Sequence, residues 1–162
     1  MKRLIVVVMG LLASTSVAQA GTVINAAPVK VYQAAEKVAL DLGAMPSVTN
    51  DTLMYFKTDP VTLKPTAKQC DCGSMFGIPY VKDSRTMANV SYKVIVKAAT
   101  KGDSEIDVTT SIDGYYDESR NSISNFMSDK RGTRSKTLDC KSTGAFEAAF
   151  IRKVKGELSN KK

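Results

Sequence analysis

Two cysteines separated by one residue, Cys70 and Cys72, are the residues of this chain best suited to chemistry. The only other cysteine in the sequence is Cys140. Three thiols can form one structural disulfide with a thiol left over, hold a soft metal ion such as Cu(I), or exchange disulfides. The three chemistries require different cysteine spacings and different neighbouring residues, so we use the surrounding sequence to choose between them.

A structural disulfide is the favoured interpretation. A bond between Cys70 and Cys72 would close a small, strained ring, which favours a bond from one of them to Cys140. We predict the pair Cys72–Cys140, which closes a loop of about 70 residues and stabilises the fold by roughly 4 kcal/mol. Cys70 is then the free thiol. The alternatives left open are a Cys70–Cys140 bond and an intermolecular disulfide through Cys70.

A thiol-based metal or redox site is the less favoured alternative. A Cu(I) site would use the three thiolates, with thioethers from Met75, Met87 and Met127. These sulfur atoms do not cluster in the sequence, so the methionines are equally well explained as core residues. Asp71 would raise the pKa of the flanking thiols and oppose a reactive thiolate. We therefore predict no metal and no cofactor.

No catalytic constellation stands out. The chain contains no histidine, which excludes histidine-based triads, His-ligated zinc sites and histidine acid–base chemistry. A group of acidic residues next to two tyrosines could bind Ca²⁺ or act as acid and base, but its spacing matches no known loop, so a solvated strand end is favoured. The group consists of Asp113, Tyr115, Tyr116, Asp117 and Glu118. We predict that the protein is not an enzyme.

Two further sets of residues could contact a partner. A basic run is a possible patch for an anionic partner, although a solvated loop is the simpler interpretation; it comprises Lys130, Arg131, Arg134 and Lys136. Apolar residues also occur in segments without periodicity: Phe76, Ile78, Tyr80 and Phe126. They could line a binding groove, but we expect them to anchor loops by packing under the sheet.

The first twenty residues have the layout of a secretory signal peptide. Lys2 and Arg3 precede an apolar run, and small residues surround Gln19 before a cut ahead of Gly21. The run is too short to span a bilayer, and no cysteine lies near the cleavage site to carry a lipid. We expect a protein that is not membrane-spanning, is periplasmic or secreted, and has one domain over residues 21–162.

The charge of the chain is mildly basic. The formal net charge is +7, and it falls to +5 without residues 1–20, which hold Lys2 and Arg3 and no acidic residue. This excess is too small to indicate nucleic-acid binding. If the charge has a partner, an envelope protein or an anionic envelope component fits better than nucleic acid, although a simply solvated surface is the favoured interpretation. The oligomeric state stays open.

Periodicity indicates two helices and several strands. Residues 88–98 and 106–112 alternate apolar and polar side chains, and a turn at residues 101–103 joins them into a long antiparallel hairpin. Lys93 and Lys97 could face Glu105 and Asp107 across its outer surface. Further short strands are expected at residues 21–25, 47–50 and 52–58, with a long connection over 60–87.

The helices fall near the two ends of the secreted chain. Pro28 can begin a helix that ends before Gly43, and Ser142 or Thr143 can cap a final helix with Phe146 and Phe150 on its apolar face. A short helix around 123–127 is also expected. The pattern predicts an α+β fold in which two helices cover one face of an antiparallel sheet.

Two stretches carry a resemblance to a known family. The opening "GTVINAAPVKVYQAAEKVALDLG" followed by a hairpin resembles the small domains of BamC-like outer-membrane assembly lipoproteins and related envelope proteins. "CDCG" and "DCKSTGAFEAAF" resemble the C-terminal part of those related envelope proteins, which are uncharacterised. The resemblance implies a helix-grip-like sheet, a cell-envelope location and no catalysis. The lipidated N-terminal cysteine of those lipoproteins has no counterpart here.

The function predicted from the sequence is that of a non-enzymatic periplasmic binding or accessory protein of the cell envelope. The alternative is a carrier that holds a small apolar ligand between the sheet and the C-terminal helix, near Phe146 and Phe150. A thiol-based copper-binding or redox protein is the less favoured alternative, because it needs the cysteines to be free.

Overall fold

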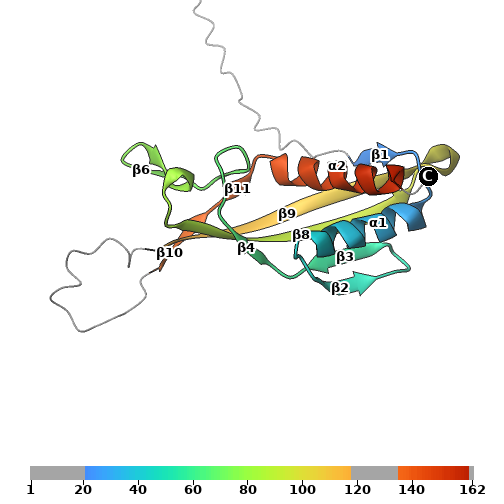
Figure 1. The fold of residues 1–162 in the computed structure, drawn as a ribbon, viewed down its shortest axis with the longest axis horizontal. Coiled ribbons are helices and arrows are strands. Elements are labelled where there is room, and N and C mark those ends of the chain that lie inside the picture. Colours follow the sequence, from blue (N-terminus) through green and yellow to red (C-terminus); the bar gives the residue numbers. More distant parts are fainter. Residues whose placement is uncertain (1–20, 118–134, 161–162) are drawn as a thin grey trace, which may run out of the picture.

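Two helices pack against a mainly antiparallel seven-stranded sheet (Figure 1). The structure is a computed structural model that describes residues 21–117 and 135–160. The helices are α1 (Pro28–Asp41) and α2 (Ala145–Ser159), and they contact each other as well as the sheet. The predicted α+β fold is therefore confirmed. The predicted signal peptide, residues 1–20, and the helix expected at 123–127 lie outside the described residues.

The strand order in the sheet is β1-β9-β8-β3-β2, with β10 paired to β9 and β4 paired to β8. The strands are β1 (Thr22–Ile24), β2 (Pro46–Asn50), β3 (Tyr55–Thr58), β4 (Val61–Leu63), β8 (Thr86–Ala98), β9 (Ser104–Asp117) and β10 (Ser135–Asp139). Two small sheets pair β5 (Cys70–Asp71) with β11 (Lys141–Ser142), and β6 (Ser74–Met75) with β7 (Ile78–Pro79). Single-turn 3₁₀ helices are η1 (Tyr80–Lys82) and η2 (Thr100–Gly102).

The long hairpin formed by β8 and β9 is the centre of the fold. Its apolar alternation places one side-chain set in the core, where Val94 lies opposite Val108. On the other face Lys97 lies opposite Glu105, as predicted, whereas Lys93 lies opposite a threonine. Both strands extend beyond the predicted limits, to Thr86 at the start of β8 and to Asp117 at the end of β9.

The α2 helix buries its apolar face against this hairpin. Phe146, Phe150 and Val154 are buried, and the ring centroid of Phe150 lies 5.1 Å from that of Tyr92 on β8. These side chains occupy the layer in which the carrier hypothesis would place a ligand. Their packing favours a core role for Phe146 and Phe150.

Several local predictions were wrong in detail. The turn after β2 spans residues 51–54, so β3 begins at Tyr55 rather than at residue 52. Strand β10 forms in a stretch for which no strand was predicted, because it pairs along the end of the long strand β9. The residue that caps α2 is Gly144, not Ser142 or Thr143. The connection over 60–87 holds β4 to β7 and η1.

Candidate functional site

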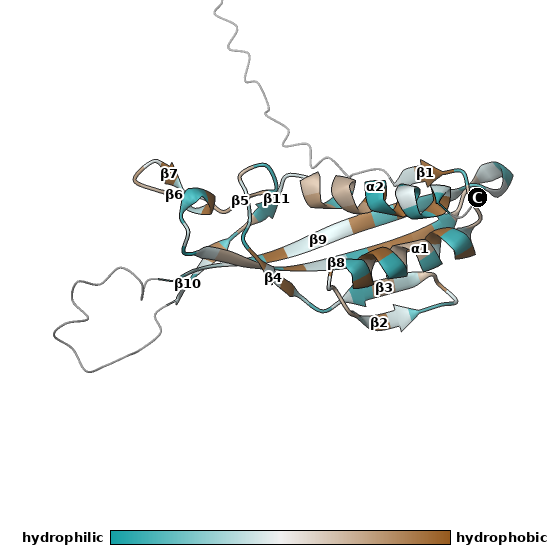
Figure 2. Cartoon of the chain, in the orientation of Figure 1, coloured by the Kyte–Doolittle hydropathy of each residue, from teal (hydrophilic) through white to brown (hydrophobic). Residues whose placement is uncertain are grey.

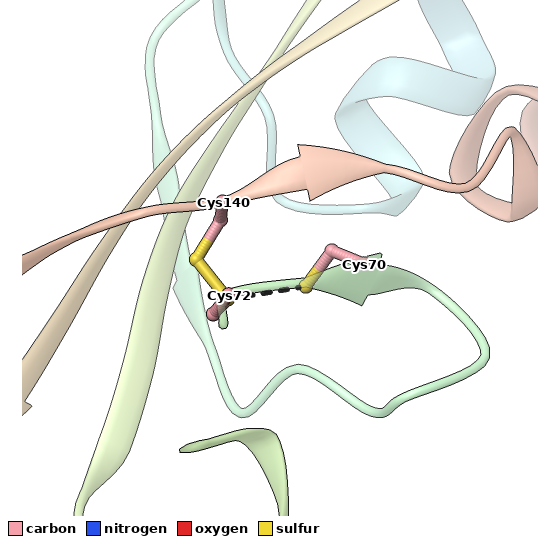
Figure 3. Close-up of side chains that lie close together, drawn as sticks. All are labelled: Cys70, Cys72 and Cys140. Atoms are coloured by element: carbon pink, nitrogen blue, oxygen red, sulfur yellow. Dashed lines mark hydrogen bonds between the residues drawn. A yellow bond between two sulfur atoms is a disulfide. The ribbon is translucent and has the colours of Figure 1, made fainter. Parts of the chain in front are cut away.

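The three cysteines meet at one end of the sheet. Cys72 and Cys140 form a disulfide, and the Sγ atom of Cys70 lies 3.6 Å from that of Cys72 (Figure 3). All three residues are buried, and β5 and β11 pair directly beside the bond. The predicted pairing is therefore confirmed, with Cys70 as the free thiol. The disulfide ties the long connection to the chain that enters α2.

A glycine on β9 makes room for this disulfide. A Cβ atom added to Gly114 would lie 2.2 Å from the Sγ atom of Cys140 and 3.1 Å from the Cβ atom of Leu138. A glycine inside a strand often marks a place where another group approaches closely. A glycine inside the alternating pattern of β9 is thus the signal in the sequence for the close approach of the disulfide.

Replacing Gly114 by alanine is expected to displace the disulfide and to lower the free energy of unfolding by about 1–3 kcal/mol, because the added methyl group overfills the site. Urea unfolding measures this loss, and a thiol count measures how much protein fails to form the bond. Gly156→Ala is the matched control. Its Cβ would meet nothing within 4 Å inside α2, so it should raise stability by about 1 kcal/mol. A Gly114→Ala protein as stable and as oxidised as the wild type would contradict the steric role.

The free thiol has little of the character of a reactive centre. Burial raises the pKa of the Cys70 thiol, and the neighbouring Asp71 carboxylate raises the pKa further. All three Sγ atoms lie within 4.8 Å of one another, a geometry that could hold a soft metal ion. Two of these sulfur atoms are joined to each other, however, so metal binding would first require reduction of the disulfide.

The β6–β7 hairpin follows the cysteines and extends from the body of the protein (Figure 2). Met75 pairs with Ile78, and the two residues between them, Phe76 and Gly77, have φ angles of 51° and 79°. Positive φ at both positions is the geometry of a type I′ turn, the tightest common hairpin connection. We call residues 75–78 the hairpin tip.

The tip is apolar and exposed. Phe76 is 97% exposed, Ile78 is 63% exposed and Met75 is 41% exposed. The expectation that Phe76 and Ile78 pack under the sheet was wrong, because the tight turn directs the tip away from the core. Tyr80 is buried, in agreement with that expectation. Phe126 lies outside the described residues.

The base of the hairpin is held by several contacts. The backbone N–H of Tyr80 donates to the carbonyl of Gly73 across the hairpin (3.0 Å), and the hydroxyl of Thr86 donates to the carbonyl of Tyr80 (2.6 Å). The Tyr80 ring packs edge-on against the ring of Tyr116 on β9, with centroids 5.3 Å apart. Together with the disulfide, these contacts fix the point where the hairpin leaves the sheet.

An ion pair supports the same base. The Arg85 guanidinium donates two hydrogen bonds to the Asp83 carboxylate and lies over the ring of Tyr116. Hydrogen bonds from Arg85 hold the pKa of Asp83 well below its usual range. The hydroxyl of Tyr116 also donates to Asp83 (3.2 Å). Asp83 is thus a structural acceptor rather than an acid or a base.

Three lysines lie at or near the base of the hairpin in the described part of the chain. Lys136 on β10 donates to the hydroxyl of Tyr80 (2.9 Å), the residue that follows the hairpin. Lys64 donates to the backbone carbonyl of Asp83, and Lys82 is exposed in η1. Of the predicted basic patch, only Lys136 is described, since Lys130, Arg131 and Arg134 lie outside the described residues.

The predicted acidic group does not form a compact site in the part that is described. Asp113 and Asp117 lie four positions apart on β9, which separates them by about 13 Å along the strand. Tyr115 shares their face, whereas Tyr116 points into the core. Glu118 lies outside the described residues. Within residues 21–117 and 135–160, the cysteines are the only group of three potential ligands close enough to hold a metal ion.

A buried carboxylate was missed from the sequence. Glu147 in the first turn of α2 is 4% exposed and accepts hydrogen bonds from the backbone N–H and hydroxyl of Thr110 and from the hydroxyl of Ser142. Thr110 lies on the stretch of β9 between the parts covered by β1 and β10. Glu147 therefore supplies a hydrogen-bond acceptor to a backbone N–H group at an uncovered edge of the sheet, which is a structural role.

Comparison of the chain with protein-family models, with curated proteins and with solved structures finds no match. The resemblance to BamC-like lipoproteins therefore stays a prediction. Among the described residues, no helix is long and apolar enough to cross a membrane. The disulfide, in turn, is typical of proteins that fold outside the cytoplasm.

Proposed function

We propose that this protein is a non-enzymatic binding or accessory protein of the cell envelope, periplasmic or secreted, and that the β6–β7 hairpin is its binding element. The observation that carries the proposal is the 97% exposure of Phe76 at the hairpin tip. Together with Met75 and Ile78 it forms an apolar group in four consecutive residues. Exposed apolar groups of this kind mark interaction sites more often than isolated surface residues do.

Phe76, at the apex of the hairpin, is an unfavourable residue for a type I′ turn. Type I′ turns favour Asn or Gly at the position that Phe76 occupies, because a bulky residue with positive φ is strained. Such strain costs about 1 kcal/mol or more and is found preferentially at functional positions. Because phenylalanine at this position costs stability, its presence supports a role in binding rather than in folding.

The anchoring of the hairpin supports the same proposal. The disulfide, the Tyr80–Tyr116 ring contact and the Thr86 hydrogen bond hold both arms at the sheet. A binding element that is ordered before it meets its partner loses less conformational entropy on binding. Since the tip contributes nothing to the core, this rigidity serves the presentation of its side chains.

The variant Phe76→Asn separates binding from folding. We expect it to raise the free energy of unfolding by about 1 kcal/mol, because asparagine accepts the left-handed conformation, and to release the protein from isolated envelope membranes. Sedimentation of the protein with these membranes measures the second effect. Leu53→Asn is the matched control, since Leu53 is 67% exposed in the turn before β3, near the other end of β8.

Two results would count against the proposal. If Phe76→Asn sediments with envelope membranes as well as the wild type does, the tip is not the binding element. If Leu53→Asn is released to the same extent as Phe76→Asn, the loss reflects general surface hydrophobicity rather than a defined site.

A further inference from the structure

We infer that the hairpin tip inserts into the surface of an anionic lipid bilayer. This inference rests on the proposed function and names its partner. Three properties of the tip favour a bilayer over a protein as its partner. They are its small exposed apolar area, the lysines near it in the sequence, and the hydrogen bonding of its backbone.

The tip is small and convex. The exposed parts of Phe76, Met75 and Ile78 amount to a few hundred Å². A stable protein–protein interface buries about 800 Å² on each partner. A bilayer needs no complementary pocket, so a projecting apolar tip of this size suits weak, reversible insertion into lipid better than a lasting protein contact.

The chain on either side of the tip is basic. From residue 64 to residue 82 the chain carries Lys64, Lys68 and Lys82 against a single acidic residue, Asp71. The Asp83 carboxylate, just beyond, is neutralised by Arg85. Lysines near the surface of a membrane are attracted to anionic headgroups. Apolar insertion and basic attraction are each too weak alone, and together they suffice for peripheral binding.

The backbone of the hairpin suits a shallow position in the interface. Unpaired backbone groups are costly in the apolar layer of a membrane. The two arms pair with each other, Ser74 with Pro79 and Met75 with Ile78, and Pro79 has no N–H group to leave unpaired. Only the tip then has to enter the lipid, with Lys82 left at the level of the headgroups.

The absence of tryptophan from the chain permits a direct test. Phe76→Trp places a single tryptophan at the tip, and Leu53→Trp places one in the β2–β3 turn as a control. With vesicles that contain phosphatidylglycerol, we expect the emission of the residue-76 reporter to shift to the blue and to be quenched by lipids brominated on their acyl chains. The residue-53 reporter should show neither effect, and vesicles of phosphatidylcholine alone should give a much weaker response.

Sedimentation with the same vesicles gives the magnitudes. Phe76→Asn should lower partitioning by on the order of tenfold or more, and Lys82→Gln by roughly fivefold. Absence of any vesicle response, while binding to envelope membranes still depends on Phe76, would overturn the lipid inference and leave the proposed function intact. Absence of both would overturn the two together.

Discussion

Replacing both Cys72 and Cys140 by alanine is expected to lower the free energy of unfolding by about 4 kcal/mol. The bond joins residues 68 positions apart, so its loss releases a long loop in the unfolded chain. It also frees the segment between β4 and β8 from the chain that enters α2. Urea unfolding of the double variant beside the wild type, both purified from an oxidising compartment, measures the loss.

The third cysteine supplies the control for this experiment. Cys70→Ala keeps the disulfide and should cost far less, since only one buried sulfur atom is removed. Cys72→Ala alone should lose less stability than the double variant, because the Sγ atom of Cys70 lies within 4.8 Å of that of Cys140 and can take over the bond. A Cys70→Ala protein as unstable as the double variant would contradict the assignment of Cys70 as a spare thiol.

Replacing Glu147 by alanine is expected to lower the free energy of unfolding by about 3 kcal/mol. The carboxylate accepts three hydrogen bonds, two from Thr110 and one from Ser142. Hydrogen bonds to a charged acceptor contribute more than neutral ones, and donors left without an acceptor add a penalty. The N–H group of Thr110 on β9 would lose its acceptor inside the protein. Chemical denaturation of the variant measures the total loss.

A second variant distinguishes hydrogen bonding from packing at this position. Glu147→Gln keeps the length of the side chain and one acceptor oxygen, so it should retain roughly half of the stability that Glu147→Ala loses. If both variants unfold at the wild-type denaturant concentration, Glu147 does not protect the edge of β9. Such a result would reopen the question of why a carboxylate is buried there.

The parts of the fold with regular periodicity could be predicted from the sequence. Alternation in β8 and β9 identifies their buried face, and the apolar spacing after Pro28 identifies α1. Strand β10 could not be found in this way. It pairs only along the edge of β9, and Leu138 is its single buried residue, so the segment shows no alternation.

The candidate site could be predicted only in part. Chain geometry disfavoured a Cys70–Cys72 ring and so favoured a bond to Cys140, but it left both Cys70 and Cys72 as possible partners. The direction of the hairpin tip could not be predicted, because an apolar residue in a loop can pack inward or point outward with equal local cost. Positive φ angles at Phe76 and Gly77 make the turn tight, and asparagine or glycine at position 76 would have indicated that turn more clearly.

The core and the hairpin tip of this protein differ in what they contribute to its stability. Buried apolar residues, the disulfide and Glu147 all support the sheet and its two helices. The hairpin tip gains nothing from this packing and carries a residue that its turn disfavours. Binding by the tip is the interpretation that accounts for its rigid base and its exposed apex together.

Photocrosslinking in living cells tests this binding role most directly. A photoreactive phenylalanine analogue placed at position 76 keeps the aromatic character of the tip, and the same analogue at position 53 serves as the control. We predict adducts with envelope lipid, or with another envelope component, at position 76 and not at position 53. Equal labelling at both positions, or none at position 76, would contradict the assignment of the hairpin tip as the binding element.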